Sequence, residues 1–245
     1  MRHAIVLLAL LAAILALPPR SRASDTAGDY QSIEIHEDFL AGASGSCFVP
    51  QTNGAGSYGN WGSDGSATRP GQIEIRTGTT ATGRAALILG NGLNSILFGG
   101  GEWAFESDIE LPGLANPGED WTLRIGFVDS YQANQSWDGA WFEYDDRVSP
   151  NWQLWTSSGG TRSVVTSSVA VSTGWHRFKA DANASGTGVE FFLDGASIGL
   201  SSLSIPTLTG QTTGAGIVMN KTAGIITRLV RVDWIDVKAT LTTAR

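Results

Sequence analysis

The chain has 245 residues, of which 42% are hydrophobic, and its 16 basic and 23 acidic residues give a net charge of −7. Nucleic acid and anionic membrane surfaces attract clusters of Lys and Arg, so this balance excludes both as expected partners. Cys47 is the only cysteine, which excludes an internal disulfide and a cysteine-based zinc site.

The first 23 residues predict a secretory signal peptide. Met1-Arg2-His3 is a short basic start, Ala4–Leu17 is almost wholly apolar, and Ser21-Arg22-Ala23 supplies small residues before a cleavage site after Ala23. The apolar run is shorter than the roughly 20 residues that span a bilayer, so the sequence favours a signal peptide over a membrane anchor. We therefore expect a secreted or periplasmic protein without a membrane anchor in the mature chain. The mature chain keeps 13 basic and 23 acidic residues.

The remaining chain is predicted to be one all-β domain from residue 33 to residue 245, after a loose segment from 24 to 32. Its best signal is Gly174–Gly199, where alternating runs are separated by polar residues and by an Asp194-Gly195 turn, as in antiparallel hairpins. Ala41–Gly71 is rich in Gly, Ser and Asn and is predicted to be a long surface loop. The other predicted strands are Ile33–Leu40, Gln72–Arg76, Arg84–Leu89, Ser95–Phe98, Glu102–Leu111, Trp121–Asp129, Gly139–Asp145, Asn151–Thr156, Ser163–Thr166, Ala215–Met219 and Arg228–Thr240.

Several stretches resemble a known fold family. WHRF and GVEFFLDGASIG, followed by VDWIDV, are similar to the concanavalin A-like jelly roll, which includes laminin G-like modules, legume-type lectins and laminarinase-type glycoside hydrolases. Arg69–Leu87, Phe105–Pro112, Trp141–Gln153 and Val232–Arg245 also resemble lectin-like domains of phage tail and virion structural proteins. The resemblance implies an antiparallel two-sheet sandwich, and it leaves function open because this fold carries many activities.

Alternation sorts the residues of the middle strands onto two faces. The outward positions combine two tryptophans with carboxylates, an amide and an arginine, a composition that suits sugar rings and their hydroxyls. We therefore predict a non-catalytic, carbohydrate-binding, lectin-like protein with a polysaccharide or glycan as its partner. Its ligand-binding residues are predicted to be Trp141, Glu143, Asp145, Trp155, Gln153 and Arg124, with Trp141 and Trp155 as stacking platforms.

Two other functions remain open from the sequence. The first is a polysaccharide hydrolase or lyase that uses Glu143 and Asp145; laminarinase-type hydrolases carry Glu-x-Asp-x-Glu on one strand, and here Trp141 replaces the first carboxylate. Glu106-x-Asp108-x-Glu110 has the same spacing, yet it resembles the preceding, non-catalytic strand. The second is a structural or adhesive assembly protein of unknown oligomeric state.

Calcium is the only cofactor candidate that the sequence suggests. The resemblance to laminin G-like and legume-type proteins implies loop carboxylates as ligands, and the carboxylates near the loop at 131–139 are Asp129, Asp138, Asp145 and Asp146. No ordered ligand spacing such as an EF-hand loop is present.

Overall fold

A computed structural model describes residues 31–40, 46–61, 68–90, 95–131 and 137–243. The predicted signal peptide and most of the predicted loose segment lie outside these residues. Strands and irregular connections make up the described ranges, and none of their segments is a helix long and apolar enough to cross a membrane.

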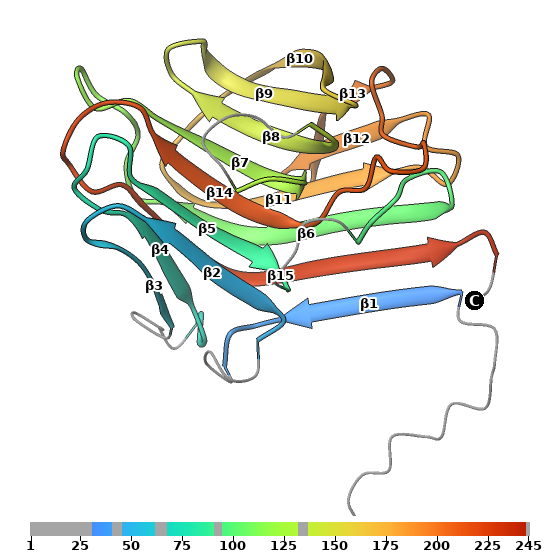
Figure 1. Cartoon of the computed structure of the whole chain (residues 1–245), viewed down its shortest axis with the longest axis horizontal. Helices are drawn as coiled ribbons and strands as arrows, with labels where there is room; N and C mark the ends of the chain where they lie inside the picture. Colours follow the sequence, from blue (N-terminus) through green and yellow to red (C-terminus); the bar gives the residue numbers. More distant parts are fainter. Residues whose placement is uncertain (1–30, 41–45, 62–67, 91–94, 132–136, 244–245) are drawn as a thin grey trace, which may run out of the picture. The chain divides into compact units, whose positions relative to one another are not determined.

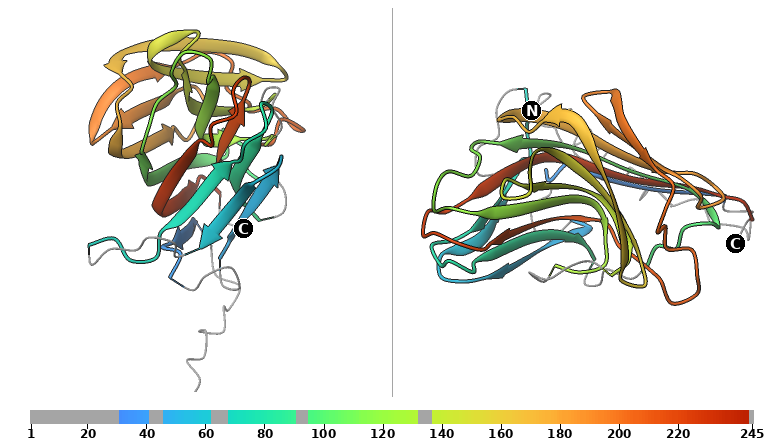
Figure 2. Two further views of the ribbon diagram at one scale, coloured as in Figure 1. Left: turned by 90° about the vertical axis from the view of Figure 1, so that its left-hand side faces the viewer. Right: turned by 90° about the horizontal axis from the view of Figure 1, so that it is seen from above.

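The strands form two antiparallel sheets, which Figures 1 and 2 show as two layers. The eight-stranded sheet has the order β13 (Ala196–Ser201), β12 (Val189–Leu193), β11 (Gly174–Ala182), β6 (Gly101–Leu111), β15 (Leu229–Leu241), β4 (Ile73–Thr77) and β3 (Ser57–Trp61), with β1 (Ser32–Glu37) paired to β15. The seven-stranded sheet has the order β10 (Thr161–Ala170), β9 (Ser149–Ser158), β8 (Gly139–Asp145), β7 (Trp121–Val128), β14 (Gly216–Lys221), β5 (Arg84–Leu89) and β2 (Phe48–Asn53). The predicted jelly-roll sandwich is confirmed.

An aromatic cluster joins the two sheets. Phe142 and Trp152 of the seven-stranded sheet meet Phe178 and Phe191 of the eight-stranded sheet, and all four are fully buried. Phe142 lies 5.2 Å from Phe178 and 5.1 Å from Phe191 between ring centroids, in edge-to-face geometry. Burial of such rings drives the packing of the layers, and the edge-to-face contacts add to it.

The predicted hairpin around Asp194-Gly195 is confirmed. β12 and β13 are joined by these two residues, with Leu193 paired to Ala196. Asp194 has φ +52° and Gly195 has φ +82°, as a two-residue turn of the I′ type requires.

The predicted loop Ala41–Gly71 is wrong in part, because it contains the strands β2 and β3. Each is the edge strand of its sheet and pairs on one side only, so it tolerates polar residues. Those polar residues are the reason why the sequence pattern predicted a loop there. Ser95–Phe98, which we expected to be a strand, forms only an isolated bridge through Ile96 to Thr213.

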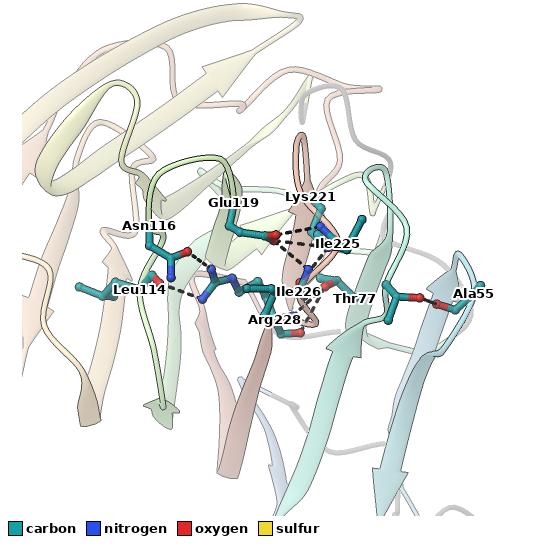
Figure 3. Close-up of polar contacts among 10 residues, drawn as sticks. Ala55, Thr77, Leu114, Asn116, Glu119, Lys221, Ile225, Ile226 and Arg228 are labelled. Carbon is teal, nitrogen blue, oxygen red and sulfur yellow. Dashed lines mark hydrogen bonds and ion pairs between the residues drawn. The ribbon is translucent and has the colours of Figure 1, made fainter.

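Polar contacts fix the loop that follows β14 (Figure 3). The Glu119 carboxylate accepts hydrogen bonds from the backbone N–H groups of Ile225 and Ile226, each at 2.9 Å, and the Lys221 Nζ donates to the Ile226 carbonyl at 2.8 Å. Arg228 donates to the Leu114 carbonyl at 3.0 Å. Although burial raises the pKa of Glu119, the two backbone N–H groups together with the charges of Lys221 and Arg228 outweigh it and lower that pKa overall. These contacts tie the β14–β15 loop to the β6–β7 loop.

Candidate functional site

The outer face of the seven-stranded sheet, which points away from the other sheet, carries the predicted binding residues. Strand register sets them in two parallel rows across β7, β8 and β9, because directly paired residues share a face. The polar row is Arg124, Glu143 and Gln153, and the aromatic row is Gly126, Trp141 and Trp155. The structure therefore brings five of the six predicted residues together in these two rows, and Asp145 lies on the same face beyond the polar row, where it pairs with Thr122.

Glu143 connects the two rows. Its Oε2 accepts a hydrogen bond from Arg124 Nε at 2.9 Å and another from Trp141 Nε1 at 3.1 Å. The side chains of Arg124 and Glu143 are only 7% and 13% exposed. Each therefore compensates the charge of the other in a poorly hydrated place, where an unpaired charge is costly.

The two tryptophans are cross-strand neighbours with nearly parallel rings. Their centroids lie 6.3 Å apart with an interplanar angle of 9°. Trp141 is only 1% exposed and packs with the apolar residues of β5, β7 and β14, whereas Trp155 is partly exposed. A side chain at Gly126, which has φ +134°, would meet the Trp141 backbone at 3.2 Å. The structure thus makes Trp155 the accessible ring and corrects our expectation of an open platform at Trp141.

Several polar atoms on this face are buried without a hydrogen-bond partner among the described residues. They are Arg124 Nη1, Gln153 Oε1, Trp155 Nε1 and both side-chain polar atoms of Asn220. Gln153 is 4% exposed and Asn220 is 1% exposed. A buried polar group without a partner costs about 1–3 kcal/mol, so each of these groups calls for a partner outside the described residues, either bound water or a ligand.

Sequence reasoning missed Asn220. It lies on β14, paired with Thr122 of β7, and therefore shares the face of Arg124. Alternation along GIVMNK puts Val218 and Asn220 on one face, but the sequence does not show that β14 is the neighbour of β7.

Asp145, the sixth predicted residue, forms an ion pair with Arg147 at the end of β8. A register shift follows Glu143 in the pairing of β8 with β9, and Asp145 lies beyond it at the end of the strand. Its carboxylate accepts hydrogen bonds from Arg147 Nε at 2.9 Å, Arg147 Nη2 at 2.6 Å and the Arg147 backbone N–H at 3.1 Å. The hydrogen bond to Asp145 raises the pKa of Arg147. Asp145 thus holds the turn between β8 and β9.

The Glu106-x-Asp108-x-Glu110 carboxylates lie on the outer face of the other sheet. Each one forms an ion pair, with distances of 2.6 Å, 2.8 Å and 2.8 Å to Arg177, Arg69 and Arg231, respectively. Burial raises the pKa of Asp108, although Arg69 opposes that shift. These carboxylates are not part of the candidate site.

Comparison with known proteins places the chain in a family. Residues 68–233 match the family described as SO2946-like, C-terminal domain. The chain belongs to this family. The comparison with curated proteins found no match.

Solved structures share the fold of this SO2946-like chain at low sequence identity. SO2946 from Shewanella oneidensis MR-1, a protein of unknown function, is 16% identical with a TM-score of 0.63, over 87% of this chain and 89% of that chain. Peanut lectin is 9% identical with a TM-score of 0.56, over 87% and 99%. The endo-1,3-beta-glucanase from Streptomyces sioyaensis is 14% identical with a TM-score of 0.53, over 89% and 100%. These similarities confirm the concanavalin A-like jelly roll.

The carboxylates that we considered as calcium ligands accept hydrogen bonds from the backbone in the described residues. Asp129 accepts hydrogen bonds from the backbone N–H groups of Trp137 and Asp138, and Asp138 accepts one from Gly159. Among the described residues, no group of three or more Asp, Glu, His or Cys side chains is placed to hold a metal ion. Residues 132–136 lie outside those ranges, so calcium stays a prediction.

A cavity of about 460 Å³ lies elsewhere, on the outer face of the eight-stranded sheet. Its lining includes Glu102, Lys179, Asp181, Glu190 and Lys238. Lys179 and Asp181 pair with each other at 2.6 Å, so these two charges are already compensated within the protein. None of the predicted binding residues lines this cavity.

Proposed function

We propose that this protein binds a neutral, hydroxyl-rich glycan on the outer face of β7, β8, β9 and β14, without catalysis. One observation carries the proposal: Arg124, Gln153, Trp155 and Asn220 have buried polar atoms without partners in the described structure, beside an accessible indole ring. A sugar offers hydroxyls to such atoms and C–H surfaces to such a ring.

The charge of the site supports a neutral ligand. Glu143 compensates Arg124, and Arg162 of β10 lies within electrostatic reach of Arg124, Glu143 and Asp129, so these two arginines and two carboxylates together have no net charge to offer an ion. The remaining atoms include donors, Arg124 Nη1 and Trp155 Nε1, and an acceptor, Gln153 Oε1. A hydroxyl group satisfies both kinds because it donates and accepts.

The carboxylates support binding without hydrolysis. A retaining hydrolase needs a nucleophile and an acid/base carboxyl about 5–5.5 Å apart. Trp141 occupies the place of the first carboxylate in the resembled strand, and Asp145 is held by Arg147. Glu143 therefore has no second free carboxylate beside it on β8.

The fold neighbours are consistent with this proposal, but the proposal does not rest on them. Peanut lectin is named as a lectin and the Streptomyces sioyaensis protein as an endo-1,3-beta-glucanase. Their identities of 9% and 14% with this chain are evidence for a shared fold, and the bound glycan has to be found by experiment.

Affinity electrophoresis tests the proposal. The purified mature protein is run in native gels containing laminarin, barley β-glucan, galactomannan or glucuronan, and we expect retardation by at least one neutral polysaccharide. Trp155→Ala and Gln153→Ala should abolish it, whereas Trp234→Ala on the outer face of the other sheet should not. Unchanged mobility of the wild type in all four gels would overturn the proposal, and release of reducing ends would replace it with a hydrolase.

We also propose that the protein is exported after cleavage behind Ala23, because its first 23 residues have the basic, apolar and small-residue segments of a signal peptide. N-terminal sequencing of the protein recovered from the periplasm or medium should begin at Ser24. Recovery of an intact N-terminus only from the cytoplasm would overturn this.

A further inference from the structure

Trp137 is the one exposed tryptophan among those whose burial is described. Its exposed fraction is 65%, whereas Trp141 at 1% and Trp152 at 0% are buried. An exposed ring contributes little to the hydrophobic stabilisation of the fold, so most of its apolar surface is available for contact with a ligand.

The backbone of Trp137 is held in place on both sides. Its N–H donates to the Asp129 carboxylate at 3.0 Å, and the next N–H, of Asp138, donates to the same carboxylate at 3.0 Å. Its carbonyl accepts hydrogen bonds from the Gly160 N–H at 2.9 Å and from Ser157 Oγ at 2.6 Å. The ring thus projects from a fixed point.

The ring rests on the Gly159-Gly160 turn between β9 and β10. A Cβ atom at Gly160 would lie 2.8 Å from Trp137 Cε3, and Gly160 has φ +80°. Glycine therefore satisfies both the turn and the ring. One side of the indole is set against the turn, and the exposed fraction shows that much of the rest faces solvent.

Trp137 lies at one end of the candidate site. Ser157, which holds its carbonyl, pairs with Gly139 and follows Gln153 and Trp155 on the same face of β9. Residues two apart on a strand are about 7 Å apart, so the span from Gln153 to Ser157 is roughly 14 Å. A single sugar ring does not cover this span, and a chain of several sugars does.

We propose that Trp137 is a second aromatic platform, which stacks on a further sugar of the glycan chain bound over Trp155 and Gln153. The site then recognises an oligosaccharide of several units rather than a monosaccharide. This inference rests on the proposed function, since it extends the same site. It requires that binding strengthen with chain length and that the gain depend on the Trp137 ring.

Titration calorimetry with two oligosaccharide series tests this. Laminari- and cello-oligosaccharides of two to six units are titrated into wild type, Trp137→Ala and Trp137→Phe. Leu208→Ala is the control, because the Leu208 side chain is 66% exposed and its backbone is joined through Gln211 to Ser158 at the same end of β9. In the series that binds, Trp137→Ala should weaken hexasaccharide binding by about tenfold and disaccharide binding by less than twofold, the size expected for one aromatic contact. Trp137→Phe should recover part of the loss, and Leu208→Ala should bind like wild type.

A second measurement uses the exposure of the ring. N-bromosuccinimide should oxidise Trp137 before the buried tryptophans, as mapped by mass spectrometry, and the hexasaccharide should protect it.

Equal hexasaccharide affinity of wild type and Trp137→Ala, with loss of binding in Trp155→Ala, would overturn the second platform and leave the proposed function intact. An equal loss for disaccharide and hexasaccharide would also overturn it. Absence of binding by the wild type in both series would overturn the second platform for these glucan chains, whereas the neutral-glycan proposal is overturned only if none of the four polysaccharides retards the protein in native gels.

Discussion

Arg124 of β7 and Glu143 of β8 are directly paired across the sheet, and Arg124 Nε donates to Glu143 Oε2 at 2.9 Å. The same carboxylate oxygen accepts the indole N–H of Trp141. One glutamate therefore orients both an arginine and a tryptophan, and it leaves Arg124 Nη1 without a partner in the described structure.

Replacement of Arg124 by methionine should lower the free energy of unfolding by about 3 kcal/mol, because it leaves the Glu143 carboxylate poorly hydrated and unpaired. The double variant Arg124→Met/Glu143→Leu should recover most of this loss. Urea denaturation of the wild type, both single variants and the double variant measures the coupling. If the loss of the double variant equals the sum of the losses of the two single variants, the two residues are not coupled.

Asn220→Leu should raise stability while it weakens glycan binding. Both side-chain polar atoms of Asn220 are buried without partners among the described residues, so an apolar side chain should stabilise the fold by about 1 kcal/mol. Asn151→Leu is the matched control, since Asn151 Nδ2 donates to the Ser167 carbonyl at 3.0 Å and its removal should destabilise. Thermal unfolding and affinity electrophoresis separate the two effects. A destabilised Asn220→Leu protein would indicate a purely structural asparagine.

Trp141 and Trp155 should differ when each is replaced by alanine. Trp141 is 1% exposed, so its loss should cost about 3–5 kcal/mol through the cavity left behind. Trp155 is partly exposed, so Trp155→Ala should cost less, about 1–2 kcal/mol, and mainly affect binding. Denaturant titration of both variants checks the order, and a reversed order would contradict the burial of the two rings.

Glu119 should make stability fall in acid. Its pKa is lowered in the folded state, so the stability that its ionised form contributes is present above the ordinary glutamate pKa and disappears as the pH falls through the folded-state value. Glu119→Gln should therefore lower the melting temperature at neutral pH, and the difference from wild type should shrink towards pH 3. Glu102→Gln, at an exposed position, should leave the melting curve unchanged. A constant difference across this pH range would contradict a role for the Glu119 charge.

Much of the outer face follows from the sequence because strand side chains alternate with period two. Alternation puts Trp141 and Glu143 on one face of β8, and Gln153 and Trp155 on one face of β9, and the register confirms both. The Asp194-Gly195 turn is equally local, since its backbone needs positive φ angles. These features depend on near neighbours in the chain.

Only the tertiary structure decides which faces meet and which side chains are covered. The pairing of β14 with β7 puts Asn220 on the face of Arg124, apolar residues of β5, β7 and β14 bury Trp141, and Arg147 in the turn after β8 binds Asp145. Each depends on strands or turns whose position the local pattern does not encode. Alternation therefore determined the chemistry of the candidate face, whereas long-range pairing determined which of its groups are open to a ligand.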